Sequence, residues 1–207
     1  MKILAVSDQV VERVYTLANN GHFKGIDLLI GCGDLPYTYL EYLLTVLNRP
    51  LFYVPGNHDP DFNPRDERSK ADGGSNLDLE TVVYNQTLIG GFGGSVRYRP
   101  DGTNQYTQSE ALRRAYQMIP KLLVNRIKYR RALDILISHS PPMGIHDDND
   151  QAHHGLKALN WLLRVAKPRY LFHGHTHFYR NNIAEFDTII EETRIINVYP
   201  YKVIDIK

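Results

Sequence analysis

The sequence predicts an α/β fold in which two mixed sheets pack face to face and helices cover both outer faces, a four-layer α-β-β-α sandwich. Three features lead to this prediction. Short apolar runs bounded by Gly, Pro or Asp are typical of buried strands. In the first half of the chain, segments with helical apolar spacing alternate with these runs, which favours parallel strands covered by helices. The second half contains strand-like segments joined by turns, which indicates antiparallel strands and a second sheet.

Five apolar runs form the predicted framework, and each stops just before residues that commonly bind metal ions. In chain order the runs are Lys2–Val6, Asp27–Ile30, Leu51–Val54, Asp134–Ile137 and Tyr170–Phe172. Helices are expected at Val10–Asn20, which Gly21 ends, at Leu40–Leu47, at Leu112–Ile127 with a kink at Pro120, and at Leu156–Ala166 before Pro168. Further strands are expected at Thr81–Tyr84, Thr87–Gly91, Asn182–Phe186, Arg194–Val198 and Tyr201–Ile206. The polar segments Asp61–Asn76 and Ser95–Gln108 are expected to be long loops at the rim of a site.

The composition places modest limits on function. With 207 residues, 43% of them hydrophobic and 23% charged, the chain is expected to form a single domain over residues 1–207. A net charge of +1 gives no reason to expect an acidic membrane surface as a partner. It does not support nucleic-acid binding either, although such binding stays possible. No apolar stretch approaches the ~20 residues that cross a bilayer. The single Cys32 cannot form an internal disulfide, so we expect a cytoplasmic protein.

Side chains that bind metal ions follow the five framework strands. They are Asp8, Asp34, Asn57, His139, His175 and His177. The carboxyl ends of strands in open α/β sheets share one rim, so these residues are expected to meet in one pocket. Carboxylate, amide and imidazole ligands together suit Mn, Fe, Zn or Ni better than Ca or Mg, and we favour Mn. Six ligands are many for one ion, whereas two divalent ions about 3.5–4 Å apart are a recurrent arrangement for phosphate-ester hydrolysis.

His58 and Asp59 are the predicted catalytic residues. His58 directly follows Asn57, so its imidazole can lean over a substrate and either stabilise the phosphoryl oxygens or protonate the leaving oxygen. Asp59 could orient that imidazole. The expected nucleophile is a hydroxide that bridges the two ions, because Lewis-acid polarisation brings the pKa of water into the physiological range.

At these residues the chain resembles the calcineurin-like metallophosphoesterase superfamily. The family pattern is Asp-x-His, Gly-Asp, Gly-Asn-His-Asp/Glu, a single His after a later strand, and Gly-His-x-His. The matching segments here are Asp8-Gln9-Val10, Gly33-Asp34, Gly56-Asn57-His58-Asp59, His139 and Gly174-His175-Thr176-His177. The resemblance spans nearly the whole chain and implies a four-layer sandwich with a dinuclear centre. It implies that Asp34 bridges the two ions. By the same resemblance, Asp8 and His177 would hold the first ion, and Asn57, His139 and His175 would hold the second.

One position departs from the family pattern. Val10 stands where the family has the His of Asp-x-His, and an aliphatic side chain cannot bind a metal ion. The first ion is therefore expected to bind weakly. Gln9 could reach in through its amide oxygen, but neighbouring residues at a strand end usually point apart. The departure also supports a second hypothesis, in which the chain is a catalytically weakened, protein-binding scaffold like the retromer subunit with this fold. The presence of His58 favours the enzyme.

Several features leave alternatives open. The segment His146-Asp147-Asp148-Asn149-Asp150 looks like a metal cluster, but adjacent carboxylates repel and a solvated acidic loop is favoured. His153 and His154 could contact substrate or could pack, and Tyr98 could line the rim or pack. The basic residues of segment 113–131 could form a nucleic-acid surface or a solvated helix face.

The predicted function is metal-dependent hydrolysis of phosphate esters. Phosphodiesters are slightly favoured over monoesters because His58 can assist a poor alkoxide leaving group, although monoesters have the same need. Specificity is expected to come from the two long loops, and the sequence identifies no substrate-binding residue.

Overall fold

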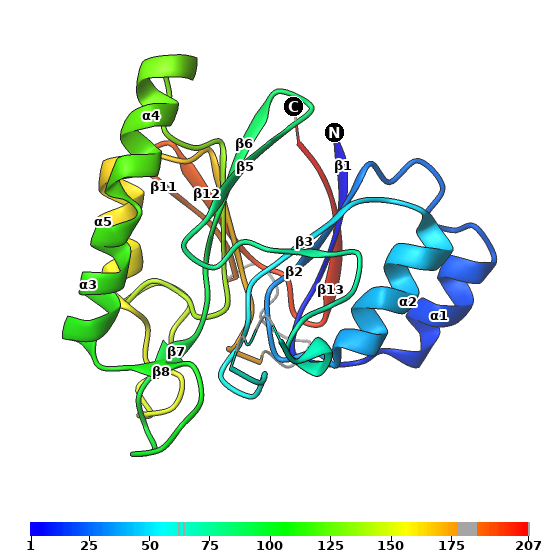
Figure 1. Ribbon diagram of the computed structural model, residues 1–207, viewed down its shortest axis with the longest axis horizontal. Helices are drawn as coiled ribbons and strands as arrows, with labels where there is room; N and C mark the ends of the chain where they lie inside the picture. The colour runs from blue at the N-terminus through cyan, green and yellow to red at the C-terminus, as the bar shows by residue number, and fades with distance from the viewer. Residues whose placement is uncertain (62, 64, 178–185, 207) are drawn as a thin grey trace.

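The computed structural model describes residues 1–61, 63, 65–177 and 186–206, and it has the four layers that the sequence predicts (Figure 1). Helices α1 (Glu12–Asn19) and α2 (Tyr37–Leu47) form one outer layer. Helices α3 (Gln108–Gln117), α4 (Ile119–Tyr129) and α5 (Lys157–Ala166) form the other. Two large sheets lie between them.

The first sheet carries the amino-terminal half of the site. Its strands run in the order β13-β1-β2-β3-β4. Strands β1 (Lys2–Val6), β2 (Leu28–Gly31), β3 (Leu51–Tyr53) and β4 (Ser75–Asn76) are parallel, and β13 (Tyr201–Asp205) pairs antiparallel with β1. The carboxyl ends of the four parallel strands therefore lie along one edge of this sheet.

The second sheet carries the remaining ligand residues. Its order is β11-β12-β10-β9-β6-β5. Strands β12 (Thr193–Asn197), β10 (Tyr170–His173), β9 (Ile135–Ser138) and β6 (Thr87–Phe92) are parallel, while the edge strands β11 (Asp187–Ile190) and β5 (Thr81–Tyr84) are antiparallel to their neighbours. A short pair, β7 (Ser95–Val96) and β8 (Gln105–Tyr106), and a 3-10 turn at Glu67–Ser69 complete the described elements.

Three apolar clusters hold the layers together. Between the sheets, Ile30, Ile137 and Phe172 belong to one cluster whose members are almost entirely inaccessible to solvent. Separate clusters join the first sheet to α1 and α2 and the second sheet to α3, α4 and α5. Full burial of each such side chain contributes roughly 1.5–3 kcal/mol relative to exposure. The rigid double sheet therefore fixes the positions of the loops that follow its strands.

Most of the predicted elements are confirmed, although several boundaries shift. The segment with the expected kink at Pro120 forms two helices, which separate at Met118. Pro120 lies in the first turn of α4, where its missing N–H is not needed. Of the expected strand Asn182–Phe186, residues 182–185 lie outside the described part of the chain, and Phe186 directly precedes β11.

Among the helices described here, none combines the length and apolar character needed to span a bilayer.

Candidate metal centre and active site

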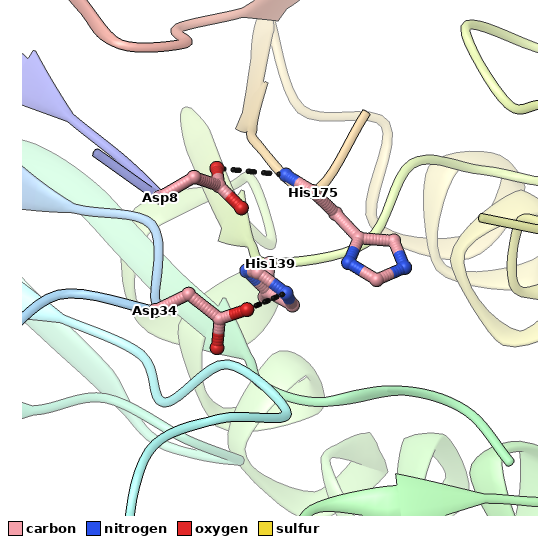
Figure 2. A group of neighbouring side chains, drawn as sticks. All are labelled: Asp8, Asp34, His139 and His175. Carbon is pink, nitrogen blue, oxygen red and sulfur yellow. Dashed lines mark hydrogen bonds and ion pairs between the residues drawn. The ribbon is translucent and has the colours of Figure 1, made fainter. Parts of the chain in front are cut away.

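The loops after the framework strands bring the predicted ligands together. Asp8 follows β1 and Asp34 follows β2 in the first sheet, while His139 follows β9 and His175 follows β10 in the second. One ligand atom from each of these four residues lies within 4.8 Å of the others (Figure 2). Within the described residues, the strand ends of both sheets thus converge on one cluster of two carboxylates and two imidazoles.

Three of the cluster residues have left-handed backbone conformations. The φ angles are 64° at Asp8, 56° at Asp34 and 66° at His175. This region costs a non-glycine residue roughly 1–2 kcal/mol, so surrounding contacts must hold it. The backbone N–H of His175 donates to Asp8 Oδ2 at 2.9 Å, and the N–H of Asp8 donates to the carbonyl of Gly33 at 3.1 Å. The ligands therefore hold one another in place.

Two glycines make room for the carboxylates. A Cβ at Gly174 would overlap Asp8 Oδ2 and the hydroxyl of Ser7, and a Cβ at Gly56 would overlap Asp34 Oδ1. The Gly that precedes Asn57 and the Gly that precedes His175 are thus required by close packing against a carboxylate of the cluster.

The imidazole of His139 is oriented for binding through Nε2. Its Nδ1 lies 2.8 Å from the carbonyl of Cys32, so Nδ1 carries the proton. Nε2 then faces two acceptors, Asp34 Oδ2 at 3.3 Å and Asn57 Oδ1 at 3.0 Å. Three atoms with lone pairs that point at one another need a positive centre between them, either a proton or a metal ion. This arrangement fits a metal site.

The charges of the ligands agree with that geometry. Burial opposes a charged His139, but the carboxylates of Asp34 and Asp8 outweigh it and raise the pKa of His139 to about 10. Burial also opposes ionisation of Asp34, yet His139 and the N–H of His58 lower the pKa of that carboxyl below its ordinary value. A cation bound among these residues would take the place of the proton on Nε2.

His175 has Nδ1, rather than Nε2, available for a metal ion. Its Nε2 lies 2.7 Å from the carbonyl of Ala152, which leaves the lone pair of Nδ1 free. Burial lowers the pKa of His175 to about 3, with a further contribution from the neighbouring His139, so the ring is neutral at pH 7. A backbone carbonyl that fixes the tautomer of a ligand histidine is a common feature of metal sites.

The remaining predicted ligands line the same cavity. It has a volume of about 280 Å³, and its lining includes Asn57 and His177 as well as Asp8, Asp34 and His175. His177 is half exposed, with Nε2 3.6 Å from Asp8 Oδ1 and its ring stacked 4.3 Å from that of Tyr199. All six predicted ligands are therefore at or beside one cavity, and His177 lies outside the tightest group.

His58 and Asp59 occupy different positions. His58 is exposed, lines the cavity, and donates its backbone N–H to Asp34 Oδ1 at 2.7 Å. Asp59 Oδ2 accepts the backbone N–H groups of Asp34 at 2.8 Å and Gly56 at 2.7 Å, so it ties together the turns after β2 and β3. Burial raises the pKa of Asp59 to about 6. Orientation of the His58 ring by Asp59 stays a prediction, because the described contacts of that carboxylate are to the backbone.

The environment of Val10 explains how the chain accommodates the departure from the family pattern. Val10 is half-buried and packs against the apolar cluster under α1 and α2. The amide oxygen of Gln9 accepts a hydrogen bond from the hydroxyl of Tyr199 at 2.8 Å, so it already has a partner. The side of the cluster formed by Asp8 and His177 thus lacks the nitrogen ligand that the family pattern would supply.

The structure places at the site two residues for which the sequence leaves the role open, Tyr98 and His153, and one that the sequence does not indicate, Ala152. The hydroxyl of Tyr98 lies 3.1 Å from Nδ2 of Asn57, and the carbonyl of Ala152 fixes His175. His153 lines the cavity, with Nδ1 2.7 Å from Asp150 Oδ2. These residues come from long loops, whose folded paths have no periodic pattern. The contact of the Ala152 carbonyl involves no side chain and depends on the path of its loop, so residue types do not indicate it.

Comparisons with known proteins support the same interpretation. The family model for calcineurin-like phosphoesterases matches residues 1–179. The structure of TT1561 from Thermus thermophilus has a TM-score of 0.61 at 14% identity and covers 95% of this chain and 88% of that chain. A second solved structure has a TM-score of 0.62 at 15% identity and covers 95% of this chain and 90% of that chain. At these identities the structures show a shared fold alone. No curated protein matches the chain.

The matched region contains every predicted ligand and both predicted catalytic residues. Its family implies divalent metal ions, and the cluster of Asp8, Asp34, His139 and His175 provides a place for them. The chain therefore belongs to the calcineurin-like phosphoesterase family.

Proposed function

We propose that the chain is a single-domain, dinuclear phosphoesterase that favours phosphodiesters. Asp34 would bind both ions, Asp8 and His177 would hold the first, and Asn57, His139 and His175 would hold the second. The observation that carries the proposal is the convergence of Asp34 Oδ2 and Asn57 Oδ1 on Nε2 of His139. When bound, the ions supply Lewis-acid activation of a water and neutralise charge on the phosphoryl oxygens.

His58 serves the leaving group. Its side chain borders both the 280 Å³ cavity and a larger neighbouring cavity of about 610 Å³, which Asp34 also lines. An ester whose phosphorus sits at the cluster can extend its leaving group into the larger cavity. The imidazole then lies between phosphorus and leaving group, where it can protonate the departing oxygen.

The larger cavity has a mixed lining that suits an organic leaving group. The first turn of α2 and the residue before it contribute Pro36, Tyr37 and Thr38, and the loop after β3 contributes Lys70. Tyr37 gives the cavity a flat aromatic surface, and Thr38 and Lys70 offer hydrogen-bond donors. The cavity thus has room and partners for a substituent larger than water.

Tyr98 serves the phosphoryl group. Nδ2 of Asn57 can only donate, so the hydroxyl oxygen of Tyr98 accepts that bond and its own proton remains available. Tyr98 lines the 280 Å³ cavity, and its backbone N–H is fixed 3.2 Å from Oε1 of the buried Gln105. We assign Tyr98 two tasks: it holds the amide of Asn57 so that Oδ1 faces the cluster, and it donates a hydrogen bond to a phosphoryl oxygen.

The charge of the smaller cavity favours phosphodiesters. Its described lining contains several histidines and carboxylates but no lysine or arginine. A monoester dianion gains from extra cationic side chains near the phosphoryl group, whereas a diester carries one negative charge and needs fewer of them. The charge balance therefore suits the diester.

The test compares a diester with a monoester after complete removal and replacement of metal. Bis(p-nitrophenyl) phosphate and p-nitrophenyl phosphate serve as substrates, with Mn²⁺ returned to chelated protein. We expect metal-dependent hydrolysis of both and a higher kcat/KM for the diester. Asp34→Asn should remove activity, while Asp101→Asn at an exposed position should not. Full metal loading without hydrolysis of either ester would reject the enzyme in favour of a scaffold.

A further inference from the structure

Helix α4 presents an apolar face to solvent. Leu123, Val124 and Ile127 have exposed fractions of 51%, 59% and 78%, while Leu122 on the opposite side of the helix is 3% exposed. Ile127 lies three and four positions after Val124 and Leu123, and residues at that spacing are neighbours on a helix surface, so these three side chains form one continuous patch. Single exposed apolar residues are ordinary, but a contiguous patch indicates an interaction surface.

The charged residues of α4 itself are all cations, and of these Lys121 is already paired with Glu80 at 2.6 Å. Helix α4 contains Lys121, Arg126 and Lys128 and no acidic residue. Arg126 and Lys128 each lie next to Ile127 in the sequence and so border the patch on either side of it. A complementary surface would therefore combine exposed apolar side chains with carboxylates.

The same chain carries such a surface at the turn between β11 and β12. Ile189 and Ile190 are 69% and 41% exposed, and the exposed Glu191 and Glu192 follow them directly. Strand β11 is also the edge of its sheet. Exposed apolar residues on an edge strand are a liability unless a partner covers them.

Both surfaces flank helix α5. Nη2 of Arg126 donates to the carbonyl of Val165 at 2.8 Å, which places α4 against the carboxyl-terminal half of α5. A cavity of about 290 Å³ is lined by Leu163 and Arg164 of α5 together with Ile190 and Glu191. Helix α5 therefore lies beside both, and the basic and acidic surfaces lie on one side of the molecule.

We propose that this side binds a second copy of the chain. A two-fold axis near α5 lets α4 of each copy cover the β11–β12 turn of the other, so both apolar patches are buried and both contacts join opposite charges. Such an isologous contact closes as a dimer and does not propagate. Direct pairing of α4 with α4 would instead bring cations together. The inference is independent of the proposed hydrolysis.

The dimer contact leaves the metal centre accessible. Helix α4 leads into β9 near Ile135, whereas the ligand His139 follows the other end of that strand. Likewise Tyr170, which pairs with Arg194 just after the acidic turn, begins β10, and His175 follows its other end. The contact and the cluster thus lie at opposite ends of the same strands.

The test is sedimentation equilibrium of the full chain, followed by charge reversal. We expect the wild type at about 50 µM, a concentration at which a micromolar dimer is mostly formed, to have twice the mass of the chain. Ile127→Asp should give the monomer mass with an unchanged circular dichroism spectrum and unchanged hydrolysis per chain. Lys128→Glu and Glu192→Lys should each weaken the dimer at least about tenfold, because each places like charges in both contacts.

Mixing those two charge variants gives the decisive comparison. In a mixed dimer, one contact joins the unchanged Lys128 of one copy to the unchanged Glu192 of the other. The second contact joins the two substituted positions, which also carry opposite charges. An equimolar mixture should therefore regain the dimer mass. A wild type that stays monomeric at that concentration would overturn the proposal, as would a dimer that Glu192→Lys leaves intact. A monomer that binds phosphatidylserine vesicles, and stops doing so in Ile127→Asp, would overturn it and assign α4 to a membrane surface.

Discussion

Oδ1 of Asn57 lies 3.0 Å from Nε2 of His139, and this contact joins the two sheets at the site. Asn57 follows β3 of the first sheet, and His139 follows β9 of the second. An ion bound between these atoms and Asp34 would be held by residues from both sheets. Metal binding should therefore stabilise the packing of one sheet on the other.

The role of His58 is tested by its truncation. His58→Ala should lower kcat by about 100-fold, the usual contribution of a general acid, while bound metal is unchanged. Metal content by atomic emission and kcat for a diester with an alkoxide leaving group, which needs a proton to depart, are the two measurements. His22→Ala is the matched control, because His22 lies outside the cavity and its ring contacts that of Phe23. Loss of metal together with activity would make His58 a ligand or a structural support.

The weak first site is tested by restoring the family residue. Val10→His should tighten binding of the first ion by at least about tenfold. Loss of a residue that only hydrogen-bonds to a metal ligand already lowers metal affinity by about 10–100-fold, and a direct ligand should contribute at least as much. Isothermal calorimetry of Mn²⁺ added to chelated protein measures both sites. Val11→His places the same side chain one residue further along and should not tighten either site. Equal affinities in wild type and Val10→His would reject the assignment of Asp8 and His177 to that ion.

The role of Tyr98 is tested by removal of its hydroxyl alone. A hydrogen bond to a charged group contributes about 1.5–3 kcal/mol, so Tyr98→Phe should weaken binding of inorganic phosphate to the Mn-loaded protein by roughly 10–100-fold. Calorimetry measures that affinity, and emission spectroscopy measures metal content. Tyr106→Phe, in the same loop but outside the cavity, is the control. Unchanged phosphate affinity in Tyr98→Phe would remove Tyr98 from the phosphoryl site.

A histidine outside the cluster makes the fold sensitive to acid. Nδ1 of His146 lies 2.8 Å from Nε2 of His173, and Nε2 of His146 lies 2.8 Å from the hydroxyl of Thr188. Burial lowers the pKa of His146 to about 4, with a further contribution from the charge of Lys202. The carboxylates of Asp187 and Asp147 oppose this shift in the pKa without reversing it.

The sign of the pH effect follows from that lowered pKa. The folded chain favours neutral His146, so its contribution to stability is present above its ordinary pKa of about 6.5 and is lost as the pH falls through about 4. We expect the free energy of unfolding of the chelated protein to fall less between those two pH values in His146→Gln than in the wild type. Urea denaturation at several pH values measures it, with His22→Gln as the control. Identical slopes in all three proteins would contradict this account.

The sequence predicts the site residues because each follows an apolar strand. Asp34 and His139 are far apart in the chain, yet both lie just beyond the carboxyl ends of buried parallel strands, which share one rim. The strands themselves are visible because they are long enough to show an apolar run. Strands of two residues, such as Ser75–Asn76, form where the tertiary structure brings them beside a neighbour, so they have no pattern of their own.

The supporting contacts could not be predicted for a similar reason. Nδ2 of Asn104 donates to the carbonyls of Gly56 and Asp59, each at 3.1 Å, and so fastens one long loop to the turn that carries Asn57. Such contacts depend on the path of an aperiodic loop. The partners of Asp59 are also backbone N–H groups, one of them in the turn after another strand, which residue types alone do not reveal.

The most direct test of the metal centre is a crystal of the Mn-soaked protein measured at the Mn absorption edge. We expect two anomalous peaks about 3.5–4 Å apart, one on each side of the carboxylate of Asp34, with the peak beside Asp8 and His177 the weaker of the two. A map with no peak between Asp34 and His139, or with a single peak that Asp34 does not contact, would contradict this prediction.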